Sequence, residues 1–285
     1  MTLVVAKRPL WLLVLAAVGA SLLLVTAMAR WGAPSDEHAY WLAARRLIEG
    51  QPLYDPAATI VTPFAYLYAP PLAQALVPVA AVVPSWLFSA GWTVLMGLAL
   101  FWLAGRDVLR ALALVAFPPV AVEFWFRNVH LFLAVLVVLG LRRAAPAFAV
   151  GAAIKVSPGL GIPYLAIRGE WRNAAIATAV GAAILAVSVV LSPDAWRAYV
   201  DFALSVDPLQ QSSFVAVPLP IRAAAGLIVA LVAARLPRWA GDPLLVVAVT
   251  LALPSLWVTG LSLLVAIVPL VEAERLARAE RLPEL

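Results

Sequence analysis

The sequence is poor in the residue types on which many functional classes depend. Its 285 residues include no cysteine, two histidines and only 12% charged residues. The lack of cysteine excludes a disulfide-stapled fold and any thiolate chemistry. The low charge excludes an ordinary soluble domain, in which about 25% of residues are charged, and it excludes a disordered chain, which needs polar residues to stay solvated.

Several functional motifs are missing as well. The chain has no Gly-x-x-x-x-Gly-Lys loop and no Gly-x-Gly-x-x-Gly turn, so nothing predicts a cradle for a nucleotide. It has no Asp-x-Asp, no histidine pair at metal-binding spacing and no serine in a nucleophile-elbow context. We therefore expect no metal site and no cofactor.

The residues that are abundant are apolar. They make up 65% of the chain and give a mean hydropathy of +0.99. Such an excess is solvated only by lipid, so the sequence predicts an all-α, polytopic transmembrane bundle. The net charge of +5 then reflects cationic loops that face the cytoplasm, and it does not call for a nucleic-acid partner.

The first membrane segment is predicted from an apolar run over residues 10–29, which follows Lys7 and Arg8. Its length of about 20 residues matches the hydrocarbon layer. The small residues at 27–29 would also suit a signal-peptide cleavage site. Because the run is longer than a usual signal-peptide core and further spans follow, a retained helix with a cytoplasmic N-terminus is favoured.

A long polar stretch, residues 30–70, is predicted to form the first outer loop. It opens with a surface helix over residues 36–49, for which Ser35 is the N-cap and Gly50 the stop. A second surface helix is expected over residues 194–206 and a cytoplasmic helical tail over residues 273–285. No change in composition divides residues 1–285 into separate domains.

The other apolar segments bring the prediction to about ten crossings (9–11), with both termini in the cytoplasm. They lie near residues 85–104, 109–122, 129–141, 146–158, 159–167, 173–191, 221–234, 243–257 and 260–272. Segment 71–83 is interpreted as re-entrant or tilted. If it does not cross, 13 of the 20 Lys and Arg residues face the cytoplasm, whereas a crossing would move Arg142 and Arg143 outside, against the positive-inside rule.

Ionisable residues at membrane depth are costly, so each is a candidate for function. Lys155 stands in an apolar stretch, where it either snorkels to the surface or holds an anion. Arg127 either anchors the interface or joins a polar group made with its neighbours Glu123, Asn128 and His130.

A third group is Asp36 and Glu37, at the start of the predicted surface helix. First-turn acids are favoured by the helix dipole, which is the alternative to a functional role. On the predicted topology all three groups face the outside, where they would supply a carboxylate, a fixed cation and hydrogen-bonding groups around one mouth.

Three stretches of the sequence resemble glycosyltransferase family 87, whose members are membrane enzymes of the GT-C fold. The first outer loop reads SDEHAYWLAARRLIEGQPLYDP and then FAYLYAPPLAQALVP, and the later stretches are FRNVHLFLAVLVVLGL and VGAAIKVSPGLGIPYLAIRGEWRNA. The similarity runs from about residue 10 to 205. Two departures stand out: Arg127-Asn128-Val129-His130 replaces the family's Gly-Gln-Val-Asn, and Thr259 takes the place of a histidine found in many relatives.

The resemblance implies an inverting, metal-independent hexosyltransferase, which moves a hexose such as mannose from a polyprenyl-phosphate donor to an acceptor hydroxyl outside the cell membrane. The acceptor would be a glycolipid, a glycan or a protein. The family's catalytic carboxylate falls on Asp36, as general base, and Lys155 or Arg127 would bind the donor phosphate. Sugar and acceptor contacts are expected from Glu37, His38, Tyr40, Tyr54, Tyr66, Tyr68, Glu123, Asn128, His130 and Trp257.

The alternative is a non-catalytic relative or a transporter that binds the same lipid-linked sugar. A transporter needs alternating access, yet the sequence shows no inverted repeat and no paired broken helices. A purely structural scaffold would leave Lys155 without a reason.

Overall fold

The computed structural model describes residues 18–19, 22–23, 35–55, 62, 64–205 and 215–272. Within these ranges all regular structure is helical, which confirms the all-α prediction. In chain order the elements are α2 (Asp36–Ile48), α3 (Pro70–Val82), α4 (Ser85–Leu103), α5 (Val108–Val115), α6 (Pro118–Phe126), α7 (His130–Arg142), α8 (Pro146–Ile154), η1 (Ser157–Leu160), α9 (Gly161–Ile167), α10 (Trp171–Leu191), α11 (Pro193–Ser205), α12 (Leu219–Ala233), α13 (Arg238–Leu251) and η3 (Val258–Ala266).

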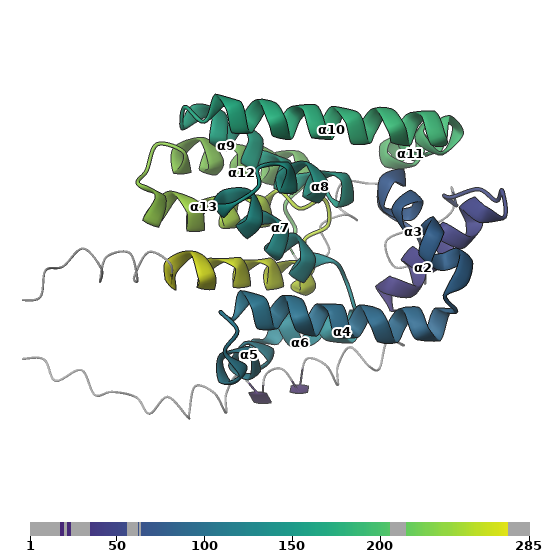
Figure 1. Cartoon of the computed structure of the whole chain (residues 1–285), viewed down its shortest axis with the longest axis horizontal. Coiled ribbons are helices and arrows are strands. Elements are labelled where there is room, and N and C mark those ends of the chain that lie inside the picture. Colours follow the sequence, from purple (N-terminus) through teal and green to yellow (C-terminus); the bar gives the residue numbers. More distant parts are fainter. Residues whose placement is uncertain are drawn as a thin grey trace, which may run out of the picture.

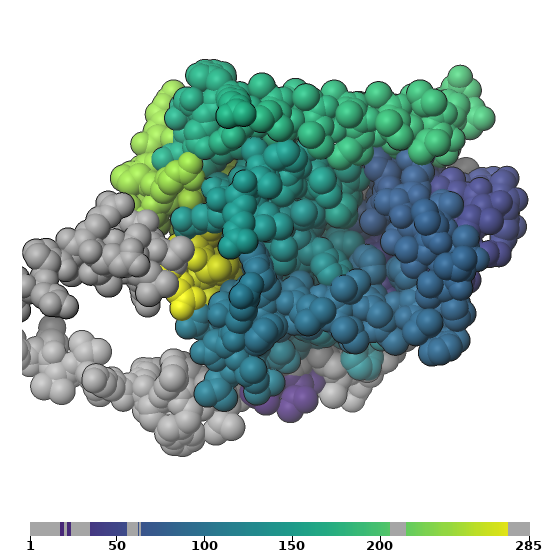
Figure 2. Space-filling view, in the orientation of Figure 1, coloured from purple at the N-terminus to yellow at the C-terminus, as the bar shows by residue number. Residues whose placement is uncertain are grey.

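Two long helices border the bundle. Figure 1 shows α10 along one side and α4 along the other, with α7, α8, α12 and α13 between them. The helices α2, α3 and α11 gather at one end of this arrangement. In Figure 2, α10 forms a ridge along the edge of the surface, and its outward residues, such as Val187 and Val190, are apolar and exposed. This face is suited to lipid rather than to water.

Within the described ranges, two helices have both the length and the hydropathy to cross a membrane alone: α4 with 19 residues and α10 with 21. A third candidate is the pair α5 and α6, which is bent by 84°. Four further apolar helices are shorter: Pro70–Val82, His130–Arg142, Leu219–Ala233 and Val258–Glu272. The count of about ten crossings therefore stays a prediction.

Three segments expected as single spans are broken in the structure. Residues 109–122 fall on the bent pair α5 and α6, because Pro118 and Pro119 lack the N–H groups that would continue α5. Within residues 146–158, α8 ends at Ile154 and residues 157–158 already belong to η1, since the ring of Pro158 would clash with the carbonyl of Ile154, four residues earlier. Residues 159–167 are divided between η1 and the seven-residue α9.

Both predicted surface helices are confirmed as helices, namely α2 and α11. Ser35 occupies the N-cap position of α2 but its side chain makes no capping hydrogen bond, and Gly50 follows α2 with a positive φ of 66°. Most of the first membrane segment, residues 56–61 of the outer loop and the tail 273–285 lie outside the described residues.

Small residues bring α12 and α13 into close contact. A Cβ atom added to Gly226 would lie 2.7 Å from the carbonyl oxygen of Ala248, and one added to Gly241 would lie 2.4 Å from that of Ala233. Each glycine therefore lets one helix approach the backbone of the other. Such small-residue contacts are typical of helix pairs in membranes, where packing rather than water drives association.

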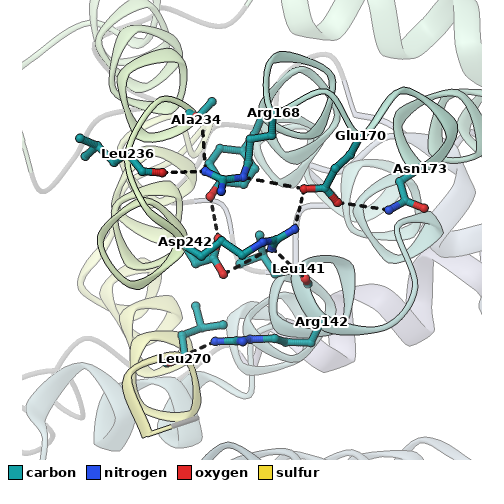
Figure 3. A network of polar contacts seen from close by, with 11 residues as sticks. Leu141, Arg142, Arg168, Glu170, Asn173, Ala234, Leu236, Asp242 and Leu270 are labelled. Atoms are coloured by element: carbon teal, nitrogen blue, oxygen red, sulfur yellow. Dashed lines mark hydrogen bonds and ion pairs between the residues drawn. The ribbon is translucent and has the colours of Figure 1, made fainter. Parts of the chain in front are cut away.

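Charged side chains tie the bundle together at the end away from α2 (Figures 1 and 3). Arg168 donates to two backbone carbonyls just after α12, at 2.8 and 3.2 Å. Arg238 donates to Glu170 at 2.5 Å, and the fully buried Asp242 accepts from the hydroxyl of Tyr164 at 2.6 Å. The two arginines belong to the group that the orientation count assigns to the cytoplasm.

Candidate functional site

The candidate site lies where the start of one helix, the break between two others and the end of a fourth come together. Asp36 is the first residue of α2, Asn128 lies in the break between α6 and α7, and Lys155 follows the last residue of α8. The loop before α3 adds Tyr68. The structure thus brings together the three polar groups that the sequence singled out, from segments more than 25 residues apart.

Asp36 is held by an amide whose orientation is fixed. The Asn128 Nδ2 group donates to Asp36 Oδ2. The Oδ1 atom of Asn128 accepts from the backbone N–H of Val129 at 2.7 Å and from the hydroxyls of Tyr68 and Tyr40 at 3.0 and 3.2 Å. Because a backbone N–H only donates, Oδ1 must face Val129, which leaves the NH₂ group for the carboxylate.

The environment of Asp36 makes its carboxyl group an unusually strong base for an aspartate. Burial raises the pKa of Asp36 to about 7, and the negative charges of Glu123 and Glu37 act in the same direction. The positive charge of Lys155 and the hydrogen bond from Asn128 oppose this rise in pKa. A carboxyl group with a pKa near neutrality suits general-base catalysis at physiological pH.

Arg127 is paired through its guanidinium with Glu37. Its Nε donates to Glu37 Oε1 at 2.7 Å, and Ser89 of α4 donates to the same oxygen at 2.6 Å. Glu37 is fully buried, whereas about a third of the Arg127 side chain (34%) is exposed. Arg127 ends α6 in the left-handed region, with φ 52° and ψ 47°, which turns the chain toward α7.

Lys155 belongs to a row of buried side chains. Its Nζ lies 2.9 Å from His130 Nε2, and His130 Nδ1 lies 3.0 Å from Glu123 Oε2. The same Nζ sits 5.1 Å from the centre of the Tyr68 ring, which places the ammonium over an aromatic face. Across the described parts of the chain no carboxylate forms an ion pair with Lys155, so the lysine is buried rather than snorkelling, with a charge that no contacting anion neutralises.

The remaining predicted residues lie around this centre. The ring of His38 stacks on Trp41, with centroids 6.0 Å apart. Tyr54 and Tyr66 belong to an aromatic cluster that reaches Phe202 of α11, and the hydroxyl of Tyr54 donates to the carbonyl of Tyr68 at 2.7 Å. These tyrosines fix the loop that carries Tyr68.

The C-terminal segment also reaches the site. Trp257 precedes η3 at its N-cap position. A Cβ atom placed on Gly260 would lie 3.8 Å from His130 Nε2, so the first turn of η3 lies against the histidine. The buried Thr259 belongs to this same turn.

Sequence reasoning did not single out three contributors. Ser89 is one of three hydroxyl residues in the apolar helix α4, with Ser85 and Thr93, and nothing in the pattern distinguishes it as a ligand of a carboxylate. Gly260 carries no chemical signal at all. Arg222 is buried and donates to the carbonyls of Val217, Leu251, Leu253 and Pro254, so it holds the turn that leads into η3.

No metal site is evident in the described residues, where no group of three or more His, Cys, Asp or Glu side chains is placed to hold an ion. Among the described polar atoms of the site, the ammonium of Lys155 contacts His130, part of Arg127 is exposed, and Glu37 Oε2 is buried without a hydrogen-bond partner.

The fold and the site define a helical membrane protein in which a buried carboxyl group lies beside a cationic group. Residues 56–273 match the model of glycosyltransferase family 87, and this match covers most of the chain. The chain therefore belongs to glycosyltransferase family 87, which implies a membrane glycosyltransferase with a sugar donor and an acceptor. No curated protein and no solved structure matches it. The family match includes Asn128, His130 and Lys155 but begins after Asp36.

Proposed function

We propose that the protein transfers one hexose, with mannose as the first candidate, from a polyprenyl-phosphate donor to the hydroxyl of an acceptor at the outer face of the cell membrane. The observation that carries this proposal is the proximity of a base-competent carboxyl group, Asp36, to the buried ammonium of Lys155, which contacts the neutral ring of His130 and forms no ion pair with a described carboxylate. Family membership supports the transfer chemistry. The proposal places both termini in the cytoplasm and keeps about ten crossings.

The proposed reaction is a single displacement. Asp36 takes the proton of the acceptor hydroxyl while the oxygen attacks the anomeric carbon. The bond between that carbon and the donor phosphate breaks, and its electron pair stays on the phosphate oxygen. Lys155 stabilises the charge that develops there, so the leaving group needs no proton. Attack opposite to the departing phosphate inverts the anomeric centre.

The other site residues take supporting roles in this proposal. Asn128 orients the Asp36 carboxylate through contacts that Tyr40 and Tyr68 fix. Arg127, held by Glu37, presents its exposed edge as a second cation near the mouth of the site. The aromatic loop that contains Tyr54 and Tyr66 supports this mouth, and His38 and Trp257 are proposed to contact the sugar or the acceptor.

Transfer is tested with purified protein in lipid, radiolabelled polyprenyl-phosphate-mannose and a panel of acceptors, in the presence of a chelator. We expect label to move to an acceptor at the same rate with and without chelator. Tight donor binding without transfer to any acceptor would favour the alternative, a non-catalytic relative or a transporter. Loss of transfer on chelation would contradict the metal-independent mechanism.

The pH dependence of transfer provides a separate prediction. Because the base must be unprotonated and its pKa is about 7, we expect log(kcat/KM) to rise with unit slope below pH 7 and to level off above it. An ordinary aspartate would place this limb near pH 4. Since the charge of Lys155 lowers the pKa of Asp36, the residual activity of Lys155→Met should show the limb at higher pH. A limb that stays at the same pH in Lys155→Met would argue against the coupling.

A further inference from the structure

Three buried side chains, Glu123, His130 and Lys155, stand in line behind the proposed donor site. Glu123 is fully buried, His130 is 1% exposed and Lys155 is 8% exposed. Their contacts are 3.0 Å from Glu123 Oε2 to His130 Nδ1 and 2.9 Å from His130 Nε2 to Lys155 Nζ. The proposed reaction uses only the last member of the row.

The direction of these hydrogen bonds follows from Glu123. Its Oε1 accepts the backbone N–H of His130 at 2.7 Å and its Oε2 faces Nδ1, so both carboxylate oxygens contact the same residue. In its ionised form the carboxylate of Glu123 only accepts, so Nδ1 of the ring then carries the proton. The Nε2 atom then has a free lone pair, and the partners assign Lys155 as the donor to it.

We infer that Glu123 and His130 are positioning residues, which fix one imidazole tautomer and so hold Lys155 as an oriented ammonium toward the donor phosphate. This rests on the proposed function, in which Lys155 binds that phosphate. A neutral acceptor is suited to the task because it orients the ammonium without neutralising its charge. If a carboxylate took the place of His130, it would form an ion pair and compete with the phosphate.

The surroundings show why such a hold is needed. Lys155 leaves α8 in an extended conformation, with φ −139° and ψ 131°, so the helix itself does not fix its side chain. The carboxyl group of Asp36 lies close enough for the charge of Lys155 to lower its pKa. Without the bond to His130, the ammonium is free to form an ion pair with Asp36. That ion pair would leave neither the base nor the phosphate-binding group available for the reaction.

The variant Glu123→Gln tests the tautomer with almost no change in shape. Its amide oxygen must face the backbone N–H of His130, so its NH₂ group faces Nδ1. The ring proton is then forced to Nε2, so that two donors, Nε2–H and the ammonium of Lys155, face each other without an acceptor. We expect Lys155 to lose its place and the affinity for the donor to fall about tenfold, as for a lost hydrogen bond to a charged group.

The ring nitrogens report the tautomer directly by ¹⁵N NMR, because the chain has only two histidines. A His38→Gln sample assigns the signals of His130. We expect a protonated Nδ1 and an unprotonated Nε2 in the wild-type protein, and the reverse in Glu123→Gln. A protonated Nε2 in the wild type, or the same tautomer in both proteins, would overturn the inference.

Binding of radiolabelled polyprenyl-phosphate-mannose completes the test in a double-mutant cycle of Glu123→Gln and Lys155→Met, with the exposed Glu49→Gln as matched control. We expect each single variant to bind about tenfold more weakly and the double variant to bind no more weakly than Lys155→Met. Additive losses, or wild-type affinity in Glu123→Gln, would overturn the inference. Unchanged affinity in Lys155→Met would instead remove Lys155 from the proposed function.

A second pair of variants keeps the inference testable if Glu123→Gln does not fold. His130→Gln retains an acceptor oxygen near the position of Nε2, whereas His130→Leu has a similar volume and no acceptor. We expect His130→Gln to bind the donor more tightly than His130→Leu. Equal affinity of these two variants would contradict a positioning role.

Discussion

Asp36→Asn should lower the rate of sugar transfer by about 10²–10⁴-fold, the usual contribution of a general base. The asparagine has the same shape, and its amide oxygen still accepts from Asn128, so the α2 terminus keeps its contacts. What it loses is the capacity to take a proton. Affinity for the donor should therefore change little, and the rise of kcat/KM below pH 7 should disappear in whatever activity remains.

The matched control for this variant is Asp194→Asn in α11, where the side chain is 89% exposed and pairs only with Arg197. We expect it to transfer at the wild-type rate, as assayed with the labelled donor and the acceptor identified for the wild type. Full activity in Asp36→Asn would show that the carboxyl group of Asp36 is not the base. Glu37 would then be the next candidate, because it holds Arg127 and Ser89 through Oε1, whereas its buried Oε2 has no hydrogen-bond partner among the described residues.

Arg222→Met should cause the largest loss of stability among single substitutions outside the site. The guanidinium is buried and donates to four backbone carbonyls, at 2.7–3.1 Å. Methionine fills much of the volume but leaves these carbonyls without their donor. With about 1–3 kcal/mol for each buried group left unsatisfied, we expect a loss of about 3 kcal/mol or more.

Thermal unfolding in detergent measures this loss, with a fall in Tm of roughly 6–12 °C expected. Arg197→Met serves as the control, since that side chain is 79% exposed and forms a single local ion pair. It should change the free energy of unfolding by less than about 0.5 kcal/mol. Equal Tm values for Arg222→Met and Arg197→Met would contradict a clamping role for Arg222.

The polar residues of the site could be found from the sequence because charge is rare in so apolar a chain. Lys155 and Glu123 stand out for this reason alone, and Asp36 by its place at the start of an amphipathic helix. The sequence also contains the residues that break the helices, Pro118 and Pro158, although the expected spans 109–122 and 146–158 include these prolines. Local chemistry decides these features, so local patterns predict them.

The partners of these residues depend on packing between distant segments and carry no local pattern. Ser89 meets Glu37 across 52 positions, and Arg222 meets the turn after α13 across about 30. For Arg127 the sequence left an interfacial anchor and a role in a polar group equally open, and it could not specify the partner found in the structure, the buried Glu37. Such pairings are set by how α2, α4 and the α6–α7 break come together, which no periodicity in the sequence specifies.

The electrostatic coupling between Asp36 and Lys155 has a thermodynamic consequence for the order of events. A donor phosphate seated on Lys155 would offset the positive charge that lowers the pKa of Asp36. By linkage, binding of the donor is then accompanied by uptake of a proton, and the donor binds more tightly at lower pH. The bound donor makes the carboxyl group a stronger base but lowers the fraction of it that is unprotonated at neutral pH, so the pH at which Asp36 can accept a proton from the acceptor is tied to the arrival of the sugar.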